Sequence, residues 1–114
     1  MSPIELYDEL FLLFPPVCPR GSNHTWESMY DGQSASLERI SNLLARHIDA
    51  AEVIILVHTD EGIGAILSKA AAASFIADNF LKADIQVSDR QLTCFVEIDH
   101  IGVGTGWRKE TKRA

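Results

Sequence analysis

The chain has 114 residues, of which 46% are hydrophobic and 23% are charged, and its formal net charge is −6 at pH 7. This length suits a single domain, and the composition excludes a wholly disordered chain. No apolar run reaches the ~20 residues that span a bilayer. The first 14 residues contain no Lys or Arg and are a poor secretory signal, so we expect a cytoplasmic protein.

The charge is unevenly distributed along the chain. Residues 1–107 hold 15 acids against 6 bases, whereas residues 108–114 hold 4 bases and 1 acid. We therefore predict one compact acidic domain over 1–107 and a mobile basic tail over 108–114. Such a body repels phosphate backbones, which argues against a nucleic-acid partner, and it attracts cationic proteins. The same acidity also keeps a small protein soluble, so charge alone assigns no function.

The N-terminal half predicts two helices separated by a long loop. Ser2 to Glu5 has the form of a capping box with Pro at the first helical position, and apolar residues then recur at helical spacing. Residues 15–34 show no period, and long loops in compact domains are often functional. Within this loop we expect one or two helical turns over Thr25–Tyr30. Ser34 is the predicted N-cap of the second helix.

The C-terminal half predicts a strand, a helix and a hairpin. Val53–Val57 is apolar and β-branched, which is typical of a strand covered on both faces. Residues 61–82 carry apolar side chains at about 100° spacing and predict a helix with Phe75 on its outer side. Residues 84–101 alternate as a hairpin that turns near Ser88-Asp89-Arg90. The residues predicted to face the core are Leu92, Cys94, Val96 and Ile98. Those predicted to share the opposite face are Thr93, Phe95, Glu97 and Asp99.

This order of elements predicts an α/β domain, with α+β as the alternative. About three helices would pack against a small mixed sheet of three to four strands. A right-handed crossover through the 61–82 helix would make the central strand parallel to one neighbour.

The segment HTDEGIG, His58 to Gly64, lies where the strand is predicted to turn into a helix. A phosphate cradle requires free backbone amides at a helix N-terminus and no competing negative charge. Asp60 and Glu61 occupy that place, so we interpret them as caps that satisfy the first turn themselves.

Metal binding or acid–base catalysis is the alternative interpretation of the same residues. A metal site would need these residues to converge with others at one sheet edge, and no pair has the spacing of a metal motif. The full candidate set is His24, His58, Asp60, Glu61, Glu97, Asp99 and His100. We therefore predict no metal, cofactor or catalytic residue. Cys18 and Cys94 are the two cysteines, and we expect both to be reduced.

These observations favour a binding protein over an enzyme. We predict a small acidic inhibitor of the immunity or antitoxin type, whose carboxylates cover the basic active site of a toxin nuclease. An aromatic anchor flanked by charges is the usual form of an interface hot spot. The predicted partner-binding residues are Glu97, Asp99 and Phe95, followed by Asp60, Glu61 and Trp26.

Two other functions remain open from the sequence. One is a metal-dependent enzyme or ligand-binding protein that uses His58, Asp60 and Glu61. The other is a subunit of a larger assembly joined through Phe75 or the hairpin edge. The sequence does not set the oligomeric state.

Overall fold

The computed structural model describes residues 2–14 and 26–108. These residues contain three helices, α1 (Pro3–Phe11), α2 (Leu37–His47) and α3 (Lys69–Asp78). They also contain eight strands, which are β1 (Glu27–Ser28), β2 (Tyr30–Asp31), β3 (Ser34–Ala35), β4 (Glu52–Val57), β5 (Ile63–Ser68), β6 (Ile85–Ser88), β7 (Cys94–Ile98) and β8 (Val103–Arg108).

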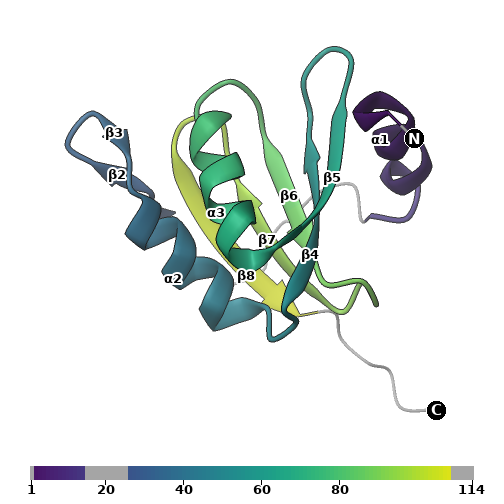
Figure 1. Cartoon of the computed structure of the whole chain (residues 1–114). Helices are drawn as coiled ribbons and strands as arrows, with labels where there is room; N and C mark the ends of the chain where they lie inside the picture. The colour runs from purple at the N-terminus through teal and green to yellow at the C-terminus, as the bar shows by residue number, and fades with distance from the viewer. Residues whose placement is uncertain (1, 15–25, 109–114) are drawn as a thin grey trace.

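The fold is of the mixed α+β class, built on one antiparallel sheet. Six strands lie in the order β1-β8-β7-β6-β4-β5, and β2 and β3 form a separate small hairpin (Figure 1). The predicted combination of about three helices with a sheet fits, in the α+β form given as the alternative, but the sheet is wider than the three to four strands expected. β4 pairs antiparallel with both β5 and β6, so the predicted parallel neighbour and its crossover are wrong.

Helices cover both faces of the sheet. α2 and α3 pack on one face, and α1 lies on the other beside the β4–β5 hairpin (Figure 1). Val53, Ile55 and Val57 of β4 belong to the main core under α2 and α3. Ile54 and Leu56 belong to a second cluster on the α1 side. β4 is therefore covered on both faces, as its unbroken apolar run predicted.

The predicted N-cap is confirmed for α1 and is wrong for α2. Ser2 caps α1, where its Oγ accepts a hydrogen bond from the Glu5 amide at 3.2 Å, as predicted. α2 is capped by Ser36, whose Oγ accepts from the Arg39 amide at 3.2 Å. The predicted cap, Ser34, instead belongs to β3.

The predicted helix over 61–82 is wrong in its first half. Residues 63–68 form β5, which pairs residue by residue with β4 from Val57↔Ile63 to Glu52↔Ser68. α3 begins only at Lys69, after the Ser68 cap. The apolar residues of 63–68 fit either period, because a short apolar run cannot separate strand from helix. The residues 58–62 form the loop that joins two strands of equal length.

The described part of the 15–34 segment is extended, so the helical turns predicted for Thr25–Tyr30 are wrong over the part the structure describes. Met29 is buried in the main core, and its amide donates to the Gly102 carbonyl at 2.9 Å. Tyr30 packs edge-on against Phe80. These contacts hold the segment against the sheet and stabilise an extended conformation over the local preference for helix. His24 and Cys18 lie outside the described residues.

The predicted hairpin over 84–101 is confirmed as β6 and β7, with its turn at Asp89. Asp89 is 6% exposed, and its carboxylate accepts from the Thr93 amide at 2.7 Å and the Cys94 amide at 3.1 Å. Cys94 faces the main core as a free, buried thiol, as expected. Leu92 does not face that core. It takes a positive φ of 59° in the turn and packs with the α1-side cluster.

No helix among the described residues is long and apolar enough to cross a membrane. Of the predicted basic tail, the structure describes Arg108 alone, at the end of β8.

Candidate functional site

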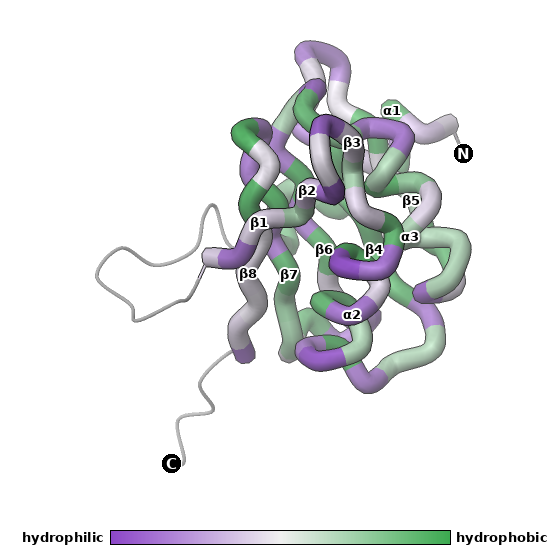
Figure 2. Tube along the Cα trace, turned by 90° about the vertical axis from the view of Figure 1, so that its left-hand side faces the viewer, coloured by the Kyte–Doolittle hydropathy of each residue, from purple (hydrophilic) through white to green (hydrophobic). Residues whose placement is uncertain are grey.

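One end of the sheet gathers several of the candidate residues. We call it the loop end, and it consists of residues 58–62 between β4 and β5, 79–84 between α3 and β6, and 99–102 between β7 and β8. The strand register brings these loops together, because Val57 pairs with Ile85, which pairs with Ile98. Figure 2 shows the β4–β5 loop at the top of the molecule as hydrophilic, above a largely hydrophobic sheet.

Asp60 and Glu61 lie in the β4–β5 loop and are exposed to solvent. The helix they were predicted to cap begins eight residues after Glu61, at Lys69, so the capping interpretation is wrong. Within the described residues, no salt bridge reaches either carboxylate. Both charges therefore remain available to a partner.

The two glycines of HTDEGIG let α1 lie close to this hairpin. A Cβ on Gly62, which has a φ of +77°, would stand 2.3 Å from Cδ1 of Tyr7. A Cβ on Gly64 would stand 2.7 Å from the Tyr7 amide nitrogen. Because any side chain larger than hydrogen would collide with α1, these glycines serve helix packing rather than phosphate binding.

His58 connects α1 to the sheet through both ring nitrogens. Its Nδ1 lies 2.7 Å from the Tyr7 hydroxyl, and its Nε2 lies 2.7 Å from Oε1 of Gln86. The Gln86 atom that faces the ring is an amide oxygen, which can only accept a hydrogen bond, so Nε2 of His58 carries the proton. In the neutral ring, Nδ1 then accepts a hydrogen bond from the Tyr7 hydroxyl. Phe11 packs edge-on against the same ring, with centroids 6.0 Å apart.

The Tyr7 phenol is held in its protonated form. Burial raises the pKa of Tyr7, and the nearby negative charge of Asp8 raises it further. Tyr7 therefore acts as a hydrogen-bond donor to His58. Since both nitrogens of His58 already have partners, this histidine is occupied by packing α1 and offers no free nitrogen to a metal.

A second cluster at the loop end consists of Asp84, Asp99 and His100. The His100 Nδ1 lies 2.9 Å from Oδ1 of Asp84 and 3.2 Å from Oδ1 of Asp99. The hydrogen bond to Asp84, followed by the negative charges of Asp84 and Asp99, raises the pKa of His100. The cluster also joins two loops, because Asp84 accepts from the His100 backbone amide at 2.8 Å.

An open hollow of about 410 Å³ lies between these groups. It brings together three residues that the sequence offered as a metal site or partner surface, His58, Asp60 and His100. Glu61 is not among its lining residues. The complete lining is His58, Thr59, Asp60, Leu81, Lys82, Ala83, Asp84 and His100.

The residues of the predicted partner surface on β7 and near it do not form one exposed surface. Phe95 is 3% exposed, since it stacks on Trp107 at 5.3 Å and meets Phe14 edge-on at 6.1 Å. Phe95 is thus a core residue and is not accessible as an anchor. Glu97 is half-buried on the same strand face, while Trp26 is exposed beside β1. Of the predicted partner residues, Asp60, Glu61 and Asp99 lie in loops of the loop end.

The surfaces suggested for a larger assembly are also occupied within the chain. Phe75 is half-buried and packs against the main core. β6 and β7 each have a paired strand on both sides, so the hairpin they form presents no free edge.

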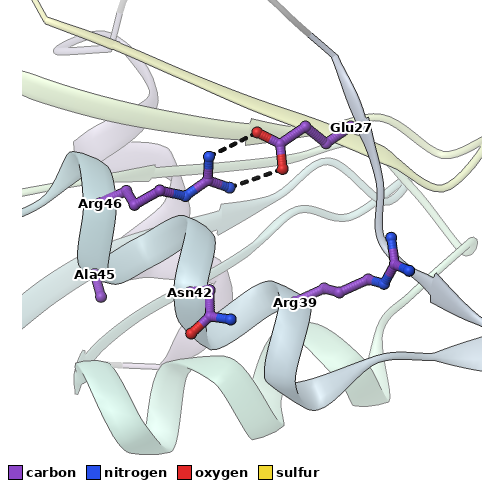
Figure 3. Close-up of a pocket in the computed structure, with 5 residues that line it drawn as sticks. All are labelled: Glu27, Arg39, Asn42, Ala45 and Arg46. Carbon is purple, nitrogen blue, oxygen red and sulfur yellow. Dashed lines mark hydrogen bonds and ion pairs between the residues drawn. The ribbon is translucent and has the colours of Figure 1, made fainter.

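A second hollow, of about 420 Å³, lies along α2 and is shown in Figure 3. Arg46 donates to the Glu27 carboxylate through its two terminal guanidinium nitrogens, at 2.7 and 2.8 Å, and Arg39 donates to the Ser28 carbonyl at 3.2 Å. The Arg46 hydrogen bonds hold the pKa of Glu27 below its usual value. These arginines attach β1 to α2 and are not arranged to receive an anion.

Comparison of the chain with protein-family models, with curated proteins and with solved structures gave no match. The loop end is therefore the part of the molecule from which a function is inferred.

Two residues of this site were missed by sequence reasoning. Tyr7 belongs to the apolar stripe of the first helix, and no local pattern links it to His58, 51 residues away. Asp84 is a single acid before a strand, and only the pairing of β6 with β7 brings it to His100.

Proposed function

We propose that this chain is a binding protein, not an enzyme, and that its acidic loop end binds a basic protein partner. In its narrower form the proposal is an immunity- or antitoxin-type inhibitor that occludes the active site of a toxin nuclease. The partner surface moves from the β7 face to the loop end, because Phe95 is buried and Asp60 and Glu61 are exposed.

The observation that supports this proposal is the uneven placement of charge. The loop end holds four acids, Asp60, Glu61, Asp84 and Asp99, against one lysine, Lys82. Three of the basic residues that the structure describes lie at the opposite end of the sheet. There Arg90 pairs with Glu52 at 2.7 Å, Arg108 pairs with Asp49 at 3.6 Å, and Lys69 donates to the Ile48 carbonyl at 2.9 Å.

This arrangement suits recognition of Lys and Arg on another molecule. Clustered carboxylates accelerate encounter with a cationic surface and repel anionic ones such as nucleic acid. A nuclease active site binds phosphates with basic groups, and carboxylates satisfy the same groups. The exposed Leu81 and Ile101 lie within the same loops and supply apolar contact beside the charges.

The test compares two charge reversals of equal size. Asp60→Lys/Glu61→Lys changes the loop end, and Asp31→Lys/Glu38→Lys makes the same change in net charge at exposed acids of β2 and α2. Each variant and the wild type are used to capture partners from extract of the native host. The captured protein is then assayed for nuclease activity with and without each variant.

We expect wild type and Asp31→Lys/Glu38→Lys to retain a basic nuclease and to inhibit it, and Asp60→Lys/Glu61→Lys to lose both properties. Equal capture by all three proteins would contradict the loop end as the binding surface. If the captured partner has no nuclease activity, the loop end stays the proposed binding surface, but the proposal of a nuclease inhibitor is rejected.

A second candidate function is metal binding, which one specific observation favours. One ligand atom from each of Asp84, Asp99 and His100 lies within 4.8 Å of the others, a spacing that a single divalent cation can bridge. Asp99 and His100 were among the metal candidates offered by the sequence, whereas Asp84 was not. His58, Asp60 and Glu61 do not belong to any group of metal-ligand spacing among the described residues.

The metal candidate is tested by titrating Zn²⁺ and Mn²⁺ into the protein in a calorimeter, with Asp84→Asn as the control variant. Stoichiometric binding that Asp84→Asn abolishes supports this function. No heat of binding, or equal binding by the variant, rejects it.

A further inference from the structure

We propose that α1 forms the apolar half of the partner surface and that its occupant is a basic amphipathic helix of the partner. This inference rests on the proposed function, since it names the chemistry of the segment that meets the acidic loop end.

The first observation is that α1 exposes an unusual share of large apolar side chains. The described residues contain eight exposed large hydrophobic side chains, and four of them, Ile4, Phe11, Leu12 and Leu13, lie on α1 and the two residues that follow it. Leu12 is 84% exposed and Leu13 is 58% exposed. Of the other four, Leu81 and Ile101 lie in the loop end, Leu37 lies on α2 and Trp26 precedes β1. An apolar group of this kind on a small domain marks an interaction surface.

The second observation is that α1 is held in one position without being buried. No residue of α1 is buried. Its sheet-facing side is instead half-buried: Tyr7 and Leu10 pack against the α1-side cluster, Tyr7 bonds to His58, and the helix lies close to Gly62 and Gly64. The helix is therefore fixed to the sheet along one side, and its other sides remain open to a partner.

The third observation decides the chemistry of the occupant. Glu5, Asp8 and Glu9 are exposed on α1, and the described residues 2–14 contain no Lys or Arg. The contact of Gly62 with Tyr7 also places the neighbouring Asp60 and Glu61 beside the helix. A second copy of this chain would bring these acids against their equivalents, and an anionic membrane would be repelled in the same way. A helix with a leucine face flanked by Lys or Arg complements both the apolar side chains and the carboxylates.

The probe is a designed 14-residue peptide, LKKLLKLLKKLLKL, whose fluorescence anisotropy is followed as protein is added. Two peptides serve as controls, one with every Lys replaced by Glu and one with every Leu replaced by Ser. The protein variants are Leu13→Ser and Leu12→Ser/Leu13→Ser. Leu37→Ser is the matched control, because Leu37 is 50% exposed on α2 and Leu13 is 58% exposed.

We expect the Lys–Leu peptide to bind wild type and Leu37→Ser equally. Leu12→Ser/Leu13→Ser should bind it about tenfold or more weakly, the size of effect typical when apolar anchors are truncated. The two control peptides should bind at least about tenfold more weakly to wild type. Leu12→Glu alone provides a second variant, since a side chain that is 84% exposed contributes little to folding.

Equal binding by Leu37→Ser and Leu12→Ser/Leu13→Ser would overturn the inference, as would equal binding of the Glu–Leu peptide. Wild type that sediments as a dimer, and a Leu12→Ser/Leu13→Ser variant that sediments as a monomer, would assign the surface to a second copy instead. If host capture requires Asp60 and Glu61 but not Leu12 and Leu13, the inference fails and the proposed function stands. If capture requires neither pair, both fail.

Discussion

The contact between α1 and the β4–β5 loop gives the sharpest stability prediction, because two glycines share a left-handed backbone conformation but differ in the space around them. Gly32 and Gly62 both have a positive φ, of +65° and +77°. A Cβ on Gly32 meets no atom within 4 Å, whereas a Cβ on Gly62 would stand 2.3 Å from the Tyr7 ring. Replacing each by Ala therefore separates the cost of the backbone conformation from the cost of displacing α1.

The expected magnitudes follow from these two terms. Forcing Ala into the left-handed region costs about 1–2 kcal/mol, and Gly32→Ala should lower the free energy of unfolding by that amount alone. Gly62→Ala carries the same cost plus about 1–3 kcal/mol for overpacking against Tyr7. The ring has little freedom to swing aside, since its hydroxyl is bound to His58 at 2.7 Å and its face is stacked on Phe11 at 5.5 Å. Losing that hydrogen bond would itself cost about 1 kcal/mol.

The assay is urea denaturation at 25 °C, with free energies from linear extrapolation. We expect Gly62→Ala to be less stable than Gly32→Ala by about 1–3 kcal/mol, and we expect the difference to disappear when both changes are made in a Tyr7→Ala background. If the two single variants lose the same free energy to within about 0.5 kcal/mol, the loop does not depend on close contact with Tyr7 and the reasoning is refuted.

Three further predictions concern hydrogen bonds that the structure shows. Tyr7→Phe removes the donor to His58 and should lower the free energy of unfolding by about 0.5–1.5 kcal/mol, measured in urea; an unchanged value would show that the bond is not formed in solution. Asp84→Asn should lower the pKa of His100, which is measured by NMR titration, because the hydrogen bond and charge of Asp84 are the main causes that raise this pKa. The stabilisation from the His100–Asp84 pair is present below the unfolded histidine pKa of about 6.5 and is lost as the pH rises through the folded value. An unchanged His100 titration in the variant would contradict the cluster. Asp89→Ala leaves two backbone amides without their acceptor and should cost about 2–4 kcal/mol in the same urea assay. Burial alone would raise the pKa of Asp89, but its hydrogen bonds to Thr93, Cys94 and Ser88 outweigh burial and lower the pKa. The free energy of unfolding of wild type should therefore fall more steeply below about pH 4 than that of Asp89→Ala. Parallel pH profiles of the two proteins would contradict this.

The parts of the fold that could be predicted are those specified by local pattern. The Ser2 cap and the unbroken apolar run of β4 each require only neighbouring residues, and both are confirmed. The β6–β7 hairpin follows from alternation, and its turn follows from Asp89, whose side chain binds amides four and five residues on.

The parts that could not be predicted depend on contacts between distant residues. The helix predicted over 61–82 gave way to β5 because pairing with β4 satisfies the backbone of residues 63–68. A signal for this existed, since five residues that include Gly62 separate two apolar runs of similar length, as in a hairpin. That one error also produced the parallel crossover and the capping role of Asp60 and Glu61.

The candidate site was predicted in part. Asp60, Glu61 and Asp99 were chosen from the sequence and gather at the loop end. Phe95 was chosen because alternation placed it on an outward face, yet that face is covered by Phe14 and Trp107. Alternation assigns a side of the sheet, and whether that side is covered depends on where α1 and its following residues pack.

The central claim is that negative charge at the loop end attracts a cationic protein. It is tested most directly by the association rate of the captured host partner, measured by stopped flow at low and high salt. We predict that Asp60→Lys/Glu61→Lys slows association at low salt by about tenfold or more, that Asp31→Lys/Glu38→Lys slows it far less, and that the difference shrinks as salt screens the charges. Equal association rates for the two variants at low salt would contradict the claim.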